Sequence, residues 1–466
     1  MATAKPKTIR ELRSAGYKVA TVKEELRRNL IKRIHGGEQL FPGIIGYEES
    51  VIPHLENAIL SGQDIIFLGE RGQAKSRLIR SLVNLLDDEV PAIAGCEISD
   101  NPFRPICRAC RDRVDDEGED VEVVWLSPDQ RYGEKLATPD ITIADLIGEV
   151  DPIKVAEGRY LSDELTIHYG LVPRTNRGIF CINELPDLAE RIQVGLLNIM
   201  EERDVQIRGY RVRMPLDVYV VASANPEDYT NRGRIITPLK DRYGAQIRTH
   251  YPRKVEHEID IMEQEHSRFE DVDHQVEVPQ YMKEIVAEIT RLARRSPDVN
   301  QRSGVSVRAS IADYESLLAN ALRRAIRIGE KTVVPRITDL PYVIPAISGK
   351  VEFETVEDGK EEQILEKLIQ GAVVAVFNRY FSIMELEEVV TRFKAGASVE
   401  VSDLLPSPAY VKMTKEIEGM DRAVRKVAPT NEPALVASAV EFILEGLHLN
   451  KRLNKDKVGG KAHYRG

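Results

Sequence analysis

The chain has 466 residues, of which 42% are hydrophobic and 30% charged, and its formal net charge is −10 at pH 7. This length is enough for about three domains of ordinary size. The acidic balance argues against a generic nucleic-acid binder, because affinity for a phosphate backbone requires a basic surface. Two local basic segments, residues 5–33 and 451–465, are candidates for such a surface, but we interpret them as solvent-exposed helix faces and a frayed end.

The first residues are polar and basic and contain neither the apolar core nor the small-residue cleavage site of a signal peptide. No stretch has the length and hydrophobicity of a transmembrane span. The four cysteines are consistent with a reducing compartment and give no disulfide framework. We therefore expect a cytoplasmic protein without a membrane span.

The chain begins with a predicted helical leader, residues 1–35, which includes an amphipathic stretch at 22–34. A helical stretch at 48–60 precedes an apolar strand at 65–68, and a helical pattern resumes at 76–86. The long segment that follows, at about 91–177, separates this part from the next strongly apolar strand. A segment of that length is expected to be an insertion with a fold or function of its own.

The next apolar strand is predicted at 178–184, followed by a helix at 189–202, a β-hairpin at 204–214 and a third strand at 217–223. Continuous apolar strands separated by helices are typical of a parallel sheet covered on both faces. The fold class is therefore α/β, with a nucleotide-binding domain over residues 36–252.

Beyond this domain the patterns become helical. Four helices are predicted in a lid subdomain at residues 253–350, namely 254–265, 281–294, 307–329 and 337–348. A charged linker leads into a C-terminal helical region, residues 351–466, for which the sequence indicates no role.

The first apolar strand runs directly into Gly69-Glu70-Arg71-Gly72-Gln73-Ala74-Lys75-Ser76. In a phosphate-binding loop of this kind, glycines let several backbone N–H groups point at a triphosphate. Lys75 would reach the outer phosphates, and Ser76 would place its hydroxyl on Mg²⁺. Ala74 stands where glycine is usual, and we expect it to fit only if its φ stays negative.

Polar residues end the next two apolar strands. Glu184 is the candidate base that orients and deprotonates the attacking water. Asn183 stands where an aspartate is usual, so it keeps an oxygen for the Mg²⁺ shell but loses a charge, which would slow turnover. Asn225 can hydrogen-bond the γ-phosphate or the water, because parallel sheets bind ligands at the carboxyl ends of their strands. An asparagine before proline is by itself a common turn former.

Three cysteines in the long segment, Cys96, Cys107 and Cys110, have the spacing Cys-x₁₀-Cys-x₂-Cys. Thiolates at this spacing can hold Zn²⁺, but a closed structural site needs four ligands. Asp100, His168 or a distant residue would have to supply the fourth. Three ordinary thiols remain the alternative interpretation, and Cys181 is interpreted as a packing residue of its strand.

Five segments occur in the order seen in AAA+ ATPases. They are 69–76, 181–184, 222–229 with its Asn-Pro-Glu-Asp-Tyr run, Leu-Lys-Asp-Arg-Tyr-Gly at 239–244, and Gly-Val-Ser-Val-Arg at 304–308. Together they resemble most the branch that contains MoxR and the magnesium-chelatase ATPase subunit, over roughly residues 35–345.

The resemblance implies a role for each matching residue. Lys75 and Ser76 would form Walker A, Glu184 would be the Walker B glutamate, and Asn225 would be sensor 1. Arg242 would be the arginine finger presented to the neighbouring subunit, and Arg308 would be sensor 2. Nucleotide contacts would come from Gly69, Glu70, Arg71, Gly72, Gln73, Ala74, Lys75, Ser76, Arg77, Ile45 and Arg308, and Mg²⁺ contacts from Ser76 and Asn183.

The resemblance further implies a ring, expected to be a hexamer, that hydrolyses ATP with Mg²⁺ and remodels a protein client. In this branch the partner often contains a von Willebrand factor A domain, and the work is metal insertion or protein-complex maturation. Two alternatives stay open: a nucleotide-gated scaffold with slow hydrolysis, and a DNA-directed helicase-like motor, against which the acidic balance counts. The Gly-Ala-Phe-Thr-Gly-Ala loop of enhancer-binding regulators is absent.

Overall fold

The structure is a computed structural model. It describes the whole chain except residues 1–4, 152, 154–155, 157–163, 202–213, 226–233, 269–273, 301–302, 355–359 and 459–460. The chain divides into two compact units, residues 1–250 and 251–466. Within the described ranges, no helix combines the length and the apolar character that crossing a membrane requires.

The first unit is built on a five-stranded sheet in which every neighbouring pair is parallel. The strands, in sheet order, are β4 (Tyr132–Leu136), β7 (Gly178–Asn183), β8 (Val218–Ala224), β1 (Ile65–Leu68) and β9 (Ala245–Arg248). The predicted α/β class is confirmed. The edge strand β4 comes from the segment that the sequence analysis treated as an insertion.

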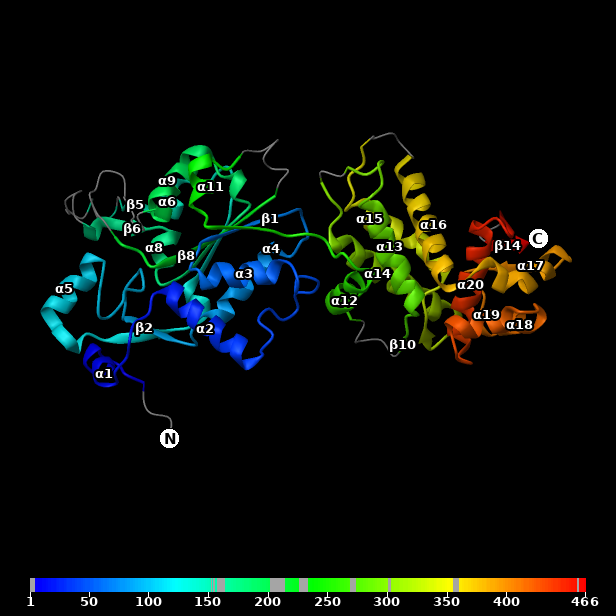
Figure 1. The fold of residues 1–466 in the computed structure, drawn as a ribbon, viewed down its shortest axis with the longest axis horizontal. Coiled ribbons are helices and arrows are strands. Elements are labelled where there is room, and N and C mark those ends of the chain that lie inside the picture. The colour runs from blue at the N-terminus through cyan, green and yellow to red at the C-terminus, as the bar shows by residue number, and fades with distance from the viewer. Residues whose placement is uncertain are drawn as a thin grey trace. The chain divides into compact units, whose positions relative to one another are not determined.

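Successive side chains of these strands enter two different cores, as the period of two requires. On β7, Phe180 and Ile182 join one core, whereas Ile179 and Cys181 join the other. The first core is covered by α9 (Glu190–Glu201) and α11 (Thr237–Arg242), and the second by α2 (Val22–Gly36), α3 (Val51–Leu60) and α4 (Lys75–Ser81). Figure 1 shows these two groups of helices on opposite sides of the strands.

The segment between α4 and β7 forms small elements around the sheet. After the 3₁₀ turn η1 (Leu82–Leu85), β2 (Val90–Ile93) pairs antiparallel with β3 (Val123–Leu126), and α5 (Arg108–Glu117) lies between them in sequence. Further along, β5 (Gly148–Val150) pairs antiparallel with β6 (Ile167–Tyr169). The short helices of the first unit are α1 (Ile9–Ser14), α6 (Ile143–Leu146), α8 (Leu171–Arg174) and the 3₁₀ turns η2 (Gly118–Asp120), η3 (Pro128–Arg131), η4 (Glu164–Thr166) and η5 (Leu185–Asp187). The predicted hairpin at 204–214 lies almost entirely outside the described residues.

The second unit is mainly helical. Its helices are α12 (Val255–Glu265), α13 (Gln280–Ala293), α14 (Val307–Ile328), η6 (Ile337–Val343), α15 (Ile344–Ser348), α16 (Lys360–Tyr380), η7 (Ile383–Leu386), α17 (Glu387–Lys394), α18 (Ser407–Glu416), α19 (Met420–Val427) and α20 (Pro433–Leu449).

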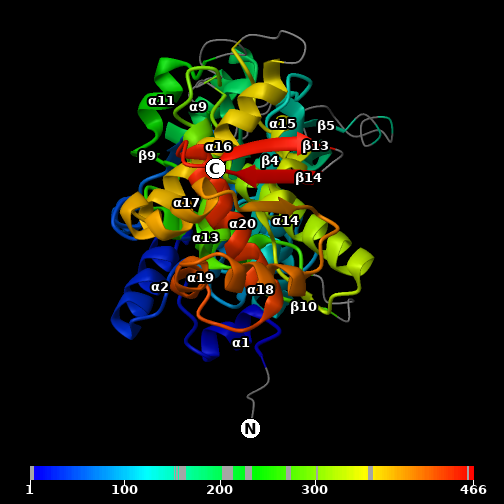
Figure 2. The same ribbon diagram turned by 90° about the vertical axis from the view of Figure 1, so that its right-hand side faces the viewer.

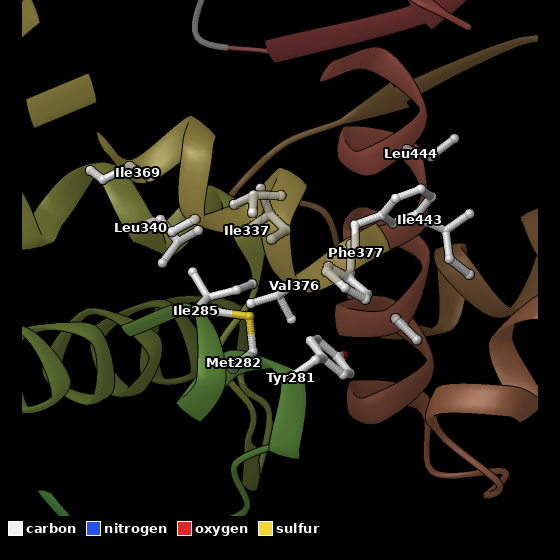
Figure 3. Close-up of a cluster of buried hydrophobic side chains, with 14 of the residues drawn as sticks. Tyr281, Met282, Ile285, Ile337, Leu340, Ile369, Val376, Phe377, Ile443 and Leu444 are labelled. Atoms are coloured by element: carbon white, nitrogen blue, oxygen red, sulfur yellow. The ribbon is translucent and has the colours of Figure 1, made fainter. Parts of the chain in front are cut away.

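One core joins α13, α16 and α20 (Figure 3). The ring of Phe442 stacks on Tyr281 with 4.4 Å between ring centroids, and Phe377 meets Phe442 edge-on. Gly446 allows this approach, because a Cβ there would lie 2.0 Å from the Phe377 ring. Residues from both predicted regions, 253–350 and 351–466, share this core, and the boundary drawn between those regions stays a prediction.

The second unit also contains strands that its sequence pattern does not predict. β12 (Ser398–Val401), β14 (Lys461–Arg465) and β13 (Asn454–Val458) form an antiparallel sheet in that order, and β10 (Gln275–Val276) pairs with β11 (Thr332–Val333). Figure 2 shows β13 and β14 side by side. The interpretation of the basic tail as a frayed end or helix face is therefore wrong. Buried Tyr464 donates its hydroxyl to Glu445, which also pairs with Lys455.

Candidate nucleotide-binding site

The phosphate loop, Glu184 and Asn225 follow the carboxyl ends of three adjacent strands of the first unit. Because β8 lies between β7 and β1, Asn225 follows the strand that separates Glu184 from the phosphate loop. Two hydrogen bonds connect the three strand ends: the Gly69 N–H donates to the Ala224 carbonyl over 3.1 Å, and the Glu184 N–H donates to the side-chain Oγ of Ser223 over 3.1 Å. This is the edge where parallel sheets bind ligands.

The loop contains two left-handed residues, Gly72 at φ 74° and Ala74 at φ 54°. The expectation that Ala74 keeps a negative φ is therefore wrong. Ala74 is the residue before α4, and its left-handed turn directs the chain from the loop into the helix. A left-handed conformation costs an L-residue about 1–2 kcal/mol, and such strain persists where the surrounding structure imposes it.

Side chains from outside the loop hold it in shape. Gln73 Oε1 accepts hydrogen bonds from the Glu70 N–H over 3.1 Å and from Thr249 Oγ1 over 2.8 Å. A larger residue at Gly69 would disturb these contacts, since a Cβ would lie 1.9 Å from Thr249 Oγ1 and 2.3 Å from Gln73 Oε1. The Tyr47 hydroxyl donates to the Gln73 carbonyl over 2.8 Å, and burial raises the pKa of Tyr47 to about 12, which keeps it a donor.

Tyr47 and Thr249 are supporting residues that sequence reasoning missed. Each lies far from the loop in the chain, and neither belongs to a motif. The pairing of β9 with β1, which brings Thr249 to the loop, is visible only in the structure.

The residues of the loop fit a bound triphosphate. Lys75 is only 7% exposed, and its ammonium donates to the carbonyl oxygens of Gly69 and Glu70, the latter over 2.9 Å. Ser76, the first-turn residue of α4, is half-buried, as is Ile45, whereas Arg71 and Arg77 are exposed. The helix N-terminus adds a partial positive charge at this point.

Asn183 is held by a network that the sequence did not indicate. Its amide donates to Glu134 on β4, and its Oδ1 accepts from Ser223 Oγ over 3.2 Å. Glu134 in turn receives two hydrogen bonds from Arg80 of α4, at 2.8 and 2.9 Å, and these hold the pKa of the Glu134 carboxyl below its usual value. A negative charge thus lies directly beside the position where the usual aspartate is missing.

Glu184 occupies a strained backbone position, with φ 56° and ψ 49°. Its side chain is half-buried, and Asn225, which follows the neighbouring strand β8, is buried. A bulky residue in the left-handed region is uncommon, and such strain concentrates at functional sites. The strain is a reason, independent of any motif, to regard Glu184 as functional.

Comparison with known proteins agrees with this geometry. The Sigma-54 interaction domain family matches residues 157–239. The chain is 25% identical over 364 residues to magnesium-chelatase subunit ChlI of Synechocystis, a match that spans 72% of this chain and 94% of that protein. It is 26% identical over 237 residues to ChlI-2 of Arabidopsis thaliana, spanning 49% of this chain and 53% of the relative.

The chain is an AAA+ protein of the magnesium-chelatase branch. It matches about half the length of the plant relatives. Among solved structures it is similar to magnesium chelatase in a complex of BchI and BchD, with 21% identity over 70% of this chain and a TM-score of 0.37. That score is low, and the assignment depends on the sequence matches.

Two arginines of this AAA+ protein are also predicted site residues. Arg242 belongs to the first unit and Arg308 to the second. Arg242 ends α11 and pairs with Glu201 of α9 over 2.6 Å. It precedes β9, whose first residue, Ala245, donates its N–H to the carbonyl of Asp64 just before β1. Arg242 therefore lies at the amino ends of the strands, whereas the phosphate loop of the same chain lies at their carboxyl ends. Arg308 is exposed on the first turn of α14, in the second unit.

The structure also brings together the three cysteines of the long segment. Cys96, Cys107 and Cys110 form one cluster, and Asp100 belongs to it. His168, the other candidate named for the fourth ligand, lies on β6 and is not a member of the cluster.

Proposed function

We propose that this AAA+ protein binds ATP with Mg²⁺ and hydrolyses it within a ring of identical subunits. The observation that carries the proposal is the convergence of Gly69–Ser76, Glu184 and Asn225 at the carboxyl edge of three adjacent strands. When bound, Mg²⁺ would neutralise charge on the phosphate oxygens. In this proposal Ser76 and the Oδ1 of Asn183 hold it.

In this proposal each residue has a distinct task. Lys75 and the N–H groups of the loop hold the phosphates, Glu184 takes a proton from the attacking water, and Asn225 orients that water or the γ-phosphate. Arg242 serves the site of a neighbouring subunit, since it lies at the sheet edge opposite its own loop. Arg308 keeps the sensor 2 role that the resemblance implies.

Steady-state phosphate release tests the hydrolysis. We expect Glu184→Gln to reduce turnover by about 10²–10⁴-fold, the range for loss of a general base, while ATP binding persists. Lys75→Ala should lose both binding and turnover. The proposal fails if Glu184→Gln hydrolyses ATP at the rate of the parent protein.

A nucleotide-gated scaffold is the second candidate, and the observation in its favour is the amide at Asn183. If ATP drives assembly while turnover of the parent protein stays at background, the scaffold is the correct interpretation.

We further propose that the ring acts on a protein partner, in a metal-insertion or maturation reaction like that for which the relatives are named. A partner with a von Willebrand factor A domain remains the expected class. Affinity purification of Glu184→Gln with ATP should retain this partner, and Lys75→Ala should not. Recovery of the same proteins with both variants would contradict the proposal.

A further inference from the structure

We propose that the cluster of Cys96, Asp100, Cys107 and Cys110 is a structural zinc site that holds the segment between β2 and α5. One donor atom from each residue lies within 4.8 Å of all the others. In a tetrahedral zinc site the sulfur atoms are about 3.8 Å apart, so the donors need to draw together by no more than about 1 Å. Cys96 Sγ and Cys107 Sγ are already 4.0 Å apart.

The carboxylate of Asp100 supplies the observation that points to a cation. Asp100 is fully buried, and its Oδ2 accepts the N–H groups of Ile106 over 3.1 Å and Cys107 over 2.9 Å. Its Oδ1 is buried and has no hydrogen-bond partner among the described residues. A buried carboxylate oxygen without a partner carries a large desolvation cost, which a cation bound by the adjacent thiolates would remove.

Backbone groups are placed to stabilise thiolates. The Asp100 N–H donates to Cys96 Sγ and the Cys110 N–H donates to Cys107 Sγ, both over 3.4 Å. Cys107 is also the N-cap of α5, where the helix dipole favours negative charge. The sulfur atoms are thus arranged as ligands and not only as packing groups.

The donor set selects zinc and a structural role. Three thiolates favour a soft or borderline metal over Mg²⁺ or Ca²⁺. Four protein ligands leave no open position for water or substrate, as in closed structural zinc sites. Asp100, Cys107 and Cys110 are buried, and Cys96 is half-buried.

The composition of α5 explains why a metal is needed there. Of its ten residues, all of them described, Cys110 alone is buried, and the helix is otherwise rich in arginine and aspartate. Burial of apolar area therefore contributes little to holding α5 in place. Zinc bound to Cys107 and Cys110 would tie the start of α5 to the loop that carries Cys96 and Asp100, and its binding free energy would stabilise this fold.

Metal content of the full chain, expressed in zinc-supplemented medium and purified without chelator, tests the proposal. We expect about one zinc per chain in the parent protein and less than about a tenth in the double variant Cys107→Ser, Cys110→Ser. Cys181→Ala is the matched control, because this fourth cysteine is buried in β7 outside the cluster, and it should keep its zinc. Asp100→Cys should keep zinc, whereas Asp100→Ala should bind it about 10–100-fold more weakly.

A second measurement does not depend on folding of the variants. Parent protein stripped with chelator should take up one Co²⁺ and show thiolate-to-cobalt charge transfer with tetrahedral d–d bands. Trypsin should cleave the stripped protein faster at Arg108, Arg111 and Arg113 of α5.

Several results would overturn the site. One is less than about half a zinc per chain after reconstitution, and another is an equal loss of zinc in Cys181→Ala. The site would also be wrong if the protein held iron with sulfide in place of zinc, or if its intact mass were lower than that of the reduced chain because Cys96 and Cys107 form a disulfide.

Discussion

At the carboxyl ends of the strands, Ala74 stands where the phosphate-loop motif usually has glycine and Asn183 where an aspartate is usual. In both cases neighbouring side chains stabilise the unusual residue. Ala74 adopts a left-handed conformation in a loop braced by Tyr47, Gln73 and Thr249. Asn183 lacks the usual carboxylate, but Glu134 receives its amide hydrogen. The Asn183 amide therefore makes a hydrogen bond to Glu134 that an aspartate carboxylate at this position could not donate.

Asn183→Asp should be destabilising despite restoring the usual residue. The new carboxylate would lie within hydrogen-bond distance of Glu134 and replace a donor–acceptor contact by like-charge repulsion. We expect the free energy of unfolding to fall by about 1–3 kcal/mol, and the deficit to grow as pH rises, because repulsion raises the pKa of the pair. Adding Glu134→Gln should recover most of the loss. Chemical denaturation of the four proteins of this cycle measures the coupling, and equal stability of Asn183→Asp and the parent would contradict the prediction.

At the scale of elements, the sequence predicted the strands and helices that have a clear hydrophobic periodicity of their own. The apolar runs at 65–68, 178–184 and 217–223 became β1, β7 and β8, and the helical periodicities became α2, α9, α13 and α14. β13 and β14 were not predicted because their sequences are largely charged, and Lys455 and Tyr464 meet Glu445 of α20 only in the folded chain. The contact of Glu134 with Asn183 was not predicted either, because the two residues meet only through the pairing of β4 with β7.

α14 contains a further feature that no pattern indicates, the buried Asp313. Both of its carboxylate oxygens lack a hydrogen-bond partner among the described residues, and burial raises its pKa well above the usual value, although Lys350 opposes the shift. An acid with a raised folded-state pKa contributes most stability below its unfolded pKa, near 4, and this contribution is lost as pH rises through the folded value.

Asp313→Asn should therefore remove a pH-dependent cost. We expect the variant to exceed the parent in unfolding free energy by about 1–3 kcal/mol at pH 8 and to lose that advantage at acidic pH. Urea denaturation at several pH values measures the difference. Asp260→Asn, on the exposed face of α12, is the surface control and should change stability little at any pH. A parallel pH profile for Asp313→Asn and the parent would show that the carboxyl is solvated.

At the scale of the molecule, the sheet topology separates the two halves of the proposed catalytic site. β1 and β9 are parallel neighbours, so the loop after β1 and Arg242 before β9 lie at opposite edges of the sheet. One subunit therefore cannot bring its own Arg242 to its own loop without refolding. A head-to-tail ring solves this geometry, because each contact joins the loop edge of one copy to the arginine edge of the next.

Mixed rings test this separation directly. Lys75→Ala and Arg242→Ala should each be nearly inactive alone, since loss of an arginine finger costs about 10³–10⁵ in rate. Co-expressed in equal amounts, they should recover about one quarter of parental ATPase activity, because a random ring pairs an intact loop with an intact arginine at one contact in four. The matched control combines Lys75→Ala with Glu184→Gln. Those residues serve the same subunit's site, so no contact is restored and no activity should return. Recovery in the control would contradict the placement of Lys75 and Glu184 in one subunit's site, and no recovery in the first mixture would place Arg242 in the site of its own subunit.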